Sequence, residues 1–238
     1  DNRLELTVVG WARDNESYVI EHRVLYGDPS TPQLWTQLDS VLFSSYERID
    51  GSQMALMATT IDSGGHFTNS VYAYAKKNAG RRIFAIKGVG GEGKPIVGRP
   101  SKSNVGKCPL FPVGVDTTKD LLFARLRIDE YGPGYIHFPD NLEDEYFKQL
   151  TAEKIVTKFT RGYKKRIFKK IRDRNEALDC FVYAMAALAI LNVDVNTLAD
   201  KVKFKHNKAE EPSKQDENKR KGTPFIPKVG GGFVNSWR

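Results

Sequence analysis

The chain has 238 residues, of which 40% are hydrophobic and 28% charged, and it carries a formal net charge of +8. This length allows one large domain or two small ones. No apolar run approaches the ~20 residues of a membrane-spanning helix, and the N-terminus lacks the pattern of a signal peptide. The two cysteines, Cys108 and Cys180, exclude a disulfide framework and a cysteine zinc site, and they favour a reducing compartment.

The first quarter of the chain predicts a β-hairpin followed by a helix. Apolar residues alternate with polar ones from Leu4 to Val8, and a second β-rich run covers residues 17–25. Pro32 then suits the first position of a helix. Apolar residues continue at helical spacing as far as Tyr46, so we expect this helix to end near Gly51.

A βαβ unit is predicted next. The continuous apolar run from Met54 to Ile61 is typical of a strand buried on both faces. A helix over residues 68–77 and a strand over 82–87 follow, so part of the sheet is expected to be parallel.

Residues 88–107 are rich in Gly, Pro, Lys and Ser and predict a long loop. The stretch from Gly88 to Lys94 resembles a phosphate-binding loop. However, Pro95 stands where the magnesium-binding Ser or Thr belongs, and no helix is expected to start there. We therefore reject a phosphate-binding loop.

The second half of the chain predicts a short strand over residues 110–115, a helix from Asp116 to about Arg127 and a later β-hairpin. Residues 175–191 give the strongest helical pattern, apolar nearly all round, so this helix should be buried against the sheet. After Val202 the composition predicts a flexible linker. The chain ends in a glycine run followed by the aromatic peptide Phe233–Arg238.

The positive charge is concentrated in the predicted hairpin and the residues just after it. Between Thr151 and Asn175, ten basic and two acidic residues give this segment the whole net charge of the chain. A neutral body with one basic stripe indicates contact with a polyanion such as DNA, although a solvated charged face is an equally simple interpretation. The basic residues are Lys154, Lys158, Arg161, Lys164, Lys165, Arg166, Lys169, Lys170, Arg172 and Arg174.

Asp62 ends the predicted buried strand, directly before a glycine-containing turn. Catalytic and ligand-binding groups gather at the carboxyl ends of strands in open α/β sheets. An Asp at this position is also an ordinary turn or helix-capping residue, and taken alone that interpretation is the simpler one.

Asp179 and Glu176 lie three residues apart in the apolar helix and therefore on one face. A carboxylate among apolar residues is unfavourable unless it is paired or binds a metal ion. For Asp179 we favour metal binding over a salt bridge to the basic segment. For Glu176, stabilisation of the helix N-terminus explains the residue equally well.

Several of these segments resemble the lambda-type phage terminase large subunit. The similarity runs from about residue 1 to residue 191 and matches the C-terminal half of such proteins, without their ATPase half. The segments that carry it, in the family's order, are Leu4–Trp11, Ile61–Gly65, Ile136–Pro139, Gln149–Glu153 and Arg174–Ala184.

This resemblance implies an α/β fold with a ribonuclease H-like mixed sheet flanked by helices. Such domains bind one or two divalent ions, Mg²⁺ or Mn²⁺, on carboxylates and cut DNA by in-line attack of water. Asp62 then matches the second carboxylate of the family and Asp179 the last, with Glu176 beside them as a further catalytic candidate. The family's first carboxylate comes just before the matched segment, so two alternatives stay open: Asp1 takes its place, or that carboxylate is not included in this sequence.

The expected organisation is a nuclease domain over residues 1–200 and a flexible basic linker with a docking peptide over residues 201–238. The resemblance implies cleavage of concatemeric double-stranded DNA at genome ends during viral packaging. The implied partners are a terminase small subunit and the portal or procapsid, the latter through the C-terminal tail. The implied location is the host cytoplasm and, transiently, the procapsid portal, but not the mature virion. Alternative functions are a resolvase or recombinase of the same fold, or a catalytically silent DNA-binding or assembly module.

Overall fold

The computed structural model describes residues 2–48, 50–160 and 162–210. The chain divides into two compact units, Asp1–Ala199 and Asp200–Arg238. Of the second unit, residues 200–210 are described, and they continue the helix α6 (Val195–Glu210). The docking peptide predicted at the C-terminus and the candidate residues Asp1 and Arg161 lie outside the described residues.

The opening β-hairpin is confirmed. The strand β1 (Arg3–Trp11) pairs antiparallel with β2 (Ser17–Tyr26), and the register shifts at a bulge between Val8 and Val9. The turn between them contains Asp14 at φ 54° and Asn15 at φ 59°, the two residue types that best tolerate this conformation. The short strand β9 (Ile136–His137) then joins β2 in parallel.

The predicted βαβ unit is also confirmed, and it positions Asp62. The helix α2 (Thr68–Lys77) connects β5 (Thr59–Asp62) to β6 (Ile83–Val89), and these strands pair in parallel. The strand β8 (Pro109–Gly114) extends the parallel part, and the two-residue strand β7 (Ser101–Lys102) closes the edge in the antiparallel sense. The principal strands thus form two mixed sheets, where one mixed sheet was expected.

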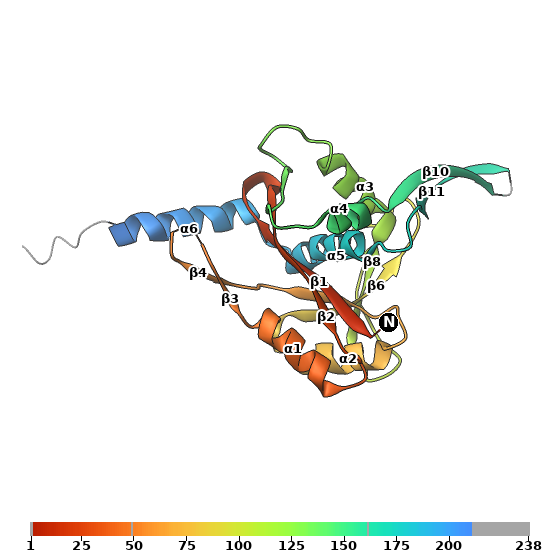
Figure 1. Ribbon diagram of the computed structural model, residues 1–238, viewed down its shortest axis with the longest axis horizontal. Helices are drawn as coiled ribbons and strands as arrows, with labels where there is room; N and C mark the ends of the chain where they lie inside the picture. The colour runs from red at the N-terminus through yellow and green to blue at the C-terminus, as the bar shows by residue number, and fades with distance from the viewer. Residues whose placement is uncertain (1, 49, 161, 211–238) are drawn as a thin grey trace, which may run out of the picture. The chain divides into compact units, whose positions relative to one another are not determined.

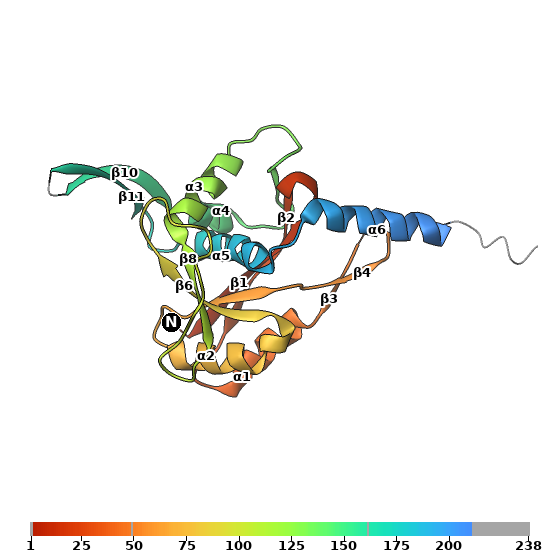
Figure 2. The same cartoon turned by 180° about the vertical axis from the view of Figure 1, so that it is seen from behind.

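The helix α5 (Glu176–Leu191) is the centre of the core of the first unit, as predicted. Ala177, Leu178, Phe181 and Val182 are fully buried. In Figures 1 and 2, α5 passes between the sheets and the helices α3 (Val115–Arg125) and α4 (Asp144–Leu150). No single described helix is long and apolar enough for a membrane span. The two helices Glu176–Leu191 and Val195–Val202 reach that length and composition only when they are taken together, and the chain bends sharply between them.

Two hairpins complete the described strands. The strands β3 (Ser45–Glu47) and β4 (Gln53–Ala55) form a small antiparallel pair. The strands β10 (Glu153–Thr160) and β11 (Tyr163–Lys170) form the predicted basic hairpin, which projects from the rest of its unit in Figure 1.

Two predicted boundaries were wrong. The helix α1 (Pro32–Leu42) ends before Tyr46, because Ser44 donates its hydroxyl to the Val41 carbonyl and the chain turns into β3. The apolar run from Met54 to Ile61 divides between β4 and β5. Met54 is 50% exposed, so apolar character there does not mark a buried strand.

Residues 202–210, which were predicted to belong to a flexible linker, are helical in α6. The Lys, Ala and Glu residues that suggested a linker also have high helix propensity. Composition alone did not separate these two states.

Candidate active site

Asp62 lies exposed at the carboxyl end of β5 and accepts two hydrogen bonds. The backbone N–H of Gly64 donates to its Oδ1 at 2.9 Å, so Asp62 does stabilise the turn after the strand. A Cβ at position 64 would lie 3.2 Å from the same oxygen, which favours glycine there. The hydroxyl of Tyr183 donates to Oδ2 at 3.2 Å. Both oxygens are therefore oriented by residues from other parts of the site.

Asp179 lies in the first turn of α5 with 35% of its side chain exposed. The amide of Asn175 donates to Oδ2 at 3.1 Å, and the Lys119 ammonium lies 3.6 Å from Oδ1. Burial raises the pKa of Asp179; the ammonium of Lys119 opposes this shift, while the charges of Glu153 and Asp62 add to it. Tyr183, on the same helix as Asp179, donates to Asp62, so β5 and α5 bring the two carboxylates to the same region of the molecule, the acidic site.

Sequence analysis missed the residues that hold this site together. Lys119, 9% exposed on α3, donates to both oxygens of Glu153 at 2.8 and 2.9 Å. Asn175 donates to Glu153 at 3.0 Å as well as to Asp179. One signal for Tyr183 was available, because it follows Asp179 by four residues and so shares its helix face. An acidic residue at the start of a strongly basic hairpin was the corresponding signal for Glu153.

The structure places Glu176 in a different cluster of charges. Arg3 and Arg174 lie 3.3 and 3.4 Å from its carboxylate oxygens. Arg174 also donates to both oxygens of Glu5 at 2.7 and 2.9 Å. The catalytic role of Glu176 stays a prediction, and the salt bridges to Arg3 and Arg174 give this carboxylate a structural role.

The acidic site offers carboxylate oxygens, the type of ligand that hard divalent cations prefer. Carboxylate oxygens are the preferred protein ligands of Mg²⁺ and Mn²⁺, and the mutual repulsion seen in the pKa of Asp179 is what a bound cation would relieve. Within the described ranges, no cluster of three or more His, Cys, Asp or Glu side chains has the geometry of a metal site. Asp62 and Asp179 are therefore a pair of candidate ligands, and Lys119 and Asn175 link Glu153 to Asp179.

The basic residues of the hairpin lie on both of its faces. Adjacent strand residues point to opposite sides, so the run Lys164, Lys165, Arg166 divides between the faces. Arg166 is bound to Asp120 by two hydrogen bonds of 2.6 and 2.7 Å. The lysines at 154, 158, 164, 165, 169 and 170 and Arg172 are exposed.

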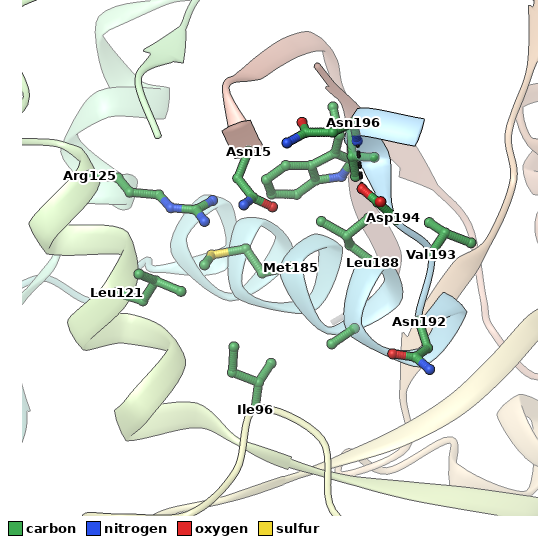
Figure 3. Close-up of a pocket in the computed structure, with 13 residues that line it drawn as sticks. Asn15, Ile96, Leu121, Arg125, Met185, Leu188, Asn192, Val193, Asp194 and Asn196 are labelled. Atoms are coloured by element: carbon green, nitrogen blue, oxygen red, sulfur yellow. Dashed lines mark hydrogen bonds between the residues drawn. The ribbon is translucent and has the colours of Figure 1, made fainter. Parts of the chain in front are cut away.

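Two of the cavities lined by described residues border α5 and β5, respectively. One of about 410 Å³ lies at the C-terminal half of α5, with Arg125, Met185 and Leu188 facing it in Figure 3. A smaller one of about 230 Å³ is bordered by Asp62 and His66. The larger cavity is thus lined by the helix end opposite to Asp179, whereas the smaller one adjoins the acidic site.

Comparison with known proteins gives a consistent result. The family described as "Terminase large subunit gpA, endonuclease domain" matches residues 1–202. The terminase large subunit of Escherichia phage lambda is 36% identical over 196 residues, which cover 79% of this chain and 31% of that protein. The terminase large subunit of Enterobacteria phage P21 is 34% identical over 197 residues, with the same coverage. The chain spans about a third of the length of these relatives, and no solved structure matches it.

Proposed function

The chain belongs to the family of the terminase large subunit endonuclease domain, and on this premise we propose that it is a metal-dependent endonuclease that cuts concatemeric double-stranded DNA during viral packaging. The observation that carries the proposal is the convergence of Asp62 and Asp179. They come from distant parts of the chain, yet Tyr183 of the helix that carries Asp179 donates a hydrogen bond to Asp62, and the charge of Asp62 adds to the raised pKa of Asp179. The mixed α/β architecture is consistent with a ribonuclease H-like fold, which we include in the proposal.

Asp62 and Asp179 would hold Mg²⁺ or Mn²⁺, which when bound stabilises the attacking and leaving oxygens of a phosphodiester undergoing hydrolysis. Tyr183 keeps Asp62 in one orientation by donating to its Oδ2. Asn175 donates to Oδ2 of Asp179, and the ammonium of Lys119 lies near its Oδ1. Asp1 stays our proposed third ligand.

Lys119 has a second consequence for the reaction. Its ammonium lies 3.6 Å from Asp179 and only 2.8 Å from Glu153. It therefore reduces the negative charge around Asp179 but does not form a close ion pair with this carboxylate. The ammonium of Lys119 thus opposes the rise that burial causes in the pKa of Asp179, and it favours the charged carboxylate that a metal ligand needs.

The basic hairpin would hold DNA by its phosphates. Contacts of lysine and arginine with phosphates position a protein on a duplex without reading its sequence. We therefore assign the choice of cutting site to a terminase small subunit. We also propose that the protein acts in the host cytoplasm and at the procapsid portal, and that Phe233–Arg238 docks there.

The proposal is tested by nicking of supercoiled plasmid DNA in Mn²⁺, Mg²⁺ or EDTA. The variants are Asp62→Asn and Asp179→Asn, with the exposed Asp129→Asn as the matched control. We expect metal-dependent cutting by the wild type and the control, and loss of cutting in both site variants. DNA binding without cutting, indifferent to metal and to Asp179→Asn, would instead support a silent DNA-binding module.

The substrate and the tail are tested separately. A preference for branched over linear DNA would favour a resolvase or recombinase. Deletion of residues 230–238 should leave cutting unchanged and weaken docking to procapsids, and equal docking by the shortened protein would contradict the role of the tail.

A further inference from the structure

The register of the basic hairpin places four lysines on one face. Lys154 pairs directly with Lys169, and Lys158 pairs directly with Lys165. Directly paired residues of an antiparallel sheet have their side chains on the same side. We call the side that carries these four residues the lysine face. Between the two lysine pairs lies the apolar pair Val156 and Ile167, which is half-buried.

The opposite face of the hairpin is held by α3. It carries Arg166, which binds Asp120, and Phe168, whose ring stacks on Phe123 with centroids 5.9 Å apart. At the base of the same face, Glu153 binds Lys119. These contacts fix which way the hairpin faces, with the lysine face directed away from α3.

The lysine face carries unbalanced positive charge. Like charges directly opposite each other destabilise a sheet, and this face contains two such pairs. All four lysines are exposed, and among the described residues none has a carboxylate within ion-pair distance. Their aliphatic stems can cover Val156 and Ile167 while the ammonium groups stay in water. A binding partner that neutralises this face would therefore remove the repulsion between its lysines.

The spacing of the lysine pairs suits a DNA duplex. The two pairs are four residues apart along each strand, which corresponds to about 13 Å at about 3.3 Å per residue. The major groove of B-DNA is about 12 Å wide and admits a two-stranded β-ribbon. One pair can thus meet the phosphates on one side of the groove while the other pair meets those on the opposite side.

We propose that the lysine face of the β10–β11 hairpin, and not the opposite face, binds the phosphates of duplex DNA. The proposal rests on the nuclease function proposed above and adds to it the surface that holds the substrate. It assigns Lys154, Lys158, Lys165 and Lys169 to phosphate contact. Lys164 and Lys170 lie on the opposite face and are not expected to contact the duplex.

The test compares two double variants that remove the same charge. Lys158→Gln with Lys165→Gln neutralises a pair on the lysine face, and Lys164→Gln with Lys170→Gln removes two exposed lysines of the opposite face. Binding of a fluorescent duplex is followed by anisotropy over a range of salt concentrations, in EDTA so that no cutting occurs. Each phosphate contact contributes about 0.9 to the slope of log K against log salt.

We expect the slope of the lysine-face variant to fall by about 2 and that of the control variant to stay at the wild-type value. Equal slopes for the two variants, whether both lowered or both unchanged, would overturn the proposal. Circular dichroism and thermal unfolding confirm that both variants fold. If a double variant does not fold, the single variants Lys158→Glu and Lys164→Glu are used, and their salt-dependence slopes are compared in the same way.

Plasmid cutting measured on the same samples separates this proposal from the nuclease function. A lowered slope in the lysine-face variant, together with a wild type that does not cut, supports the binding surface and contradicts the nuclease. Metal-dependent cutting by the wild type with equal slopes in the two variants contradicts the binding surface alone.

Discussion

Lys119 and Glu153 form an ion pair that is almost closed to solvent. The ammonium lies 2.8 and 2.9 Å from the two carboxylate oxygens, and the side chains are 9% and 8% exposed. Lys119 belongs to α3 and Glu153 is the first residue of β10, so the pair joins the base of the hairpin to the core. Because Asp179 lies 3.6 Å from the same ammonium, Lys119 interacts electrostatically with two carboxylates.

Replacement of Lys119 by Met should lower the free energy of unfolding by about 3 kcal/mol, since it leaves Glu153 buried and without its partner. The double variant with Glu153→Leu should recover most of the loss, because an apolar pair can replace a buried ion pair without large cost. Urea denaturation measures both changes. The exposed Lys77→Met is the control, and a double variant no more stable than Lys119→Met would contradict the paired role.

Replacement of Tyr183 by Phe removes the hydroxyl that donates to Asp62 and leaves the ring in place. Residues that orient metal ligands typically contribute tenfold or more to metal affinity. We therefore expect the Mn²⁺ concentration for half-maximal plasmid cutting to rise about tenfold while the unfolding midpoint changes little. Tyr131→Phe, at a residue that is 80% exposed, is the matched control. An unchanged Mn²⁺ requirement would show that Tyr183 does not orient Asp62.

His22 should make the stability fall in mild acid. Burial lowers its pKa below the ordinary 6.5; the nearby Arg174 acts in the same direction, while Glu5 opposes it. The unfolded chain therefore takes up a proton at a higher pH than the folded protein, so stability is lost as the pH falls from above 6.5 through the folded pKa. The imidazole also meets the hydroxyl of Thr7 and the ring of Tyr146.

The measurement is urea denaturation of the wild type and of His22→Asn between pH 5 and pH 8. The variant should lose less stability than the wild type over this range, because the titrating group is gone. His66→Asn, at an exposed position, controls for the loss of a histidine. Parallel curves for the wild type and His22→Asn would contradict the prediction.

Gly114 joins β8 to α3 where the preceding loop passes close by. A Cβ there would lie 2.4 Å from the carbonyl oxygen of Pro95, and its own N–H donates to the carbonyl of Ile96. Gly114→Ala should therefore destabilise the protein by about 2 kcal/mol through backbone displacement. Thermal unfolding tests this against Gly80→Ala, where a Cβ meets no atom within 4 Å. Equal unfolding midpoints for the two variants would show that the loop containing Pro95 and Ile96 moves away from the new Cβ without cost.

Much of the fold was predictable because its signals are local. The period-2 alternation of the two hairpins and the near-continuous apolar character of residues 176–191 each specify an element without help from the rest of the chain. Asp62 and Asp179 were chosen as candidates from local signals too, the first from its place at a strand end and the second from its apolar surroundings.

The missing parts depend on contacts between distant segments. Lys119, Glu153 and Asn175 come from three different segments, and no local pattern indicates that one ammonium and one amide connect them. The exposed strand β4 was misread for a related reason. Its apolar residues pair with β3 in a small sheet, and burial is a property of the assembled fold.

The length of the hairpin sets how far from the acidic site the protein can hold its substrate. Each of its strands has eight residues, which gives an arm of about 26 Å at about 3.3 Å per residue. At about 3.4 Å per base pair this reach corresponds to about eight base pairs of duplex. A nuclease that binds DNA along this hairpin contacts more of the duplex on one side of the cleavage point than on the other. Duplexes that end within a few base pairs of the cleavage point, on the side of the arm, should therefore be cut less readily than longer ones.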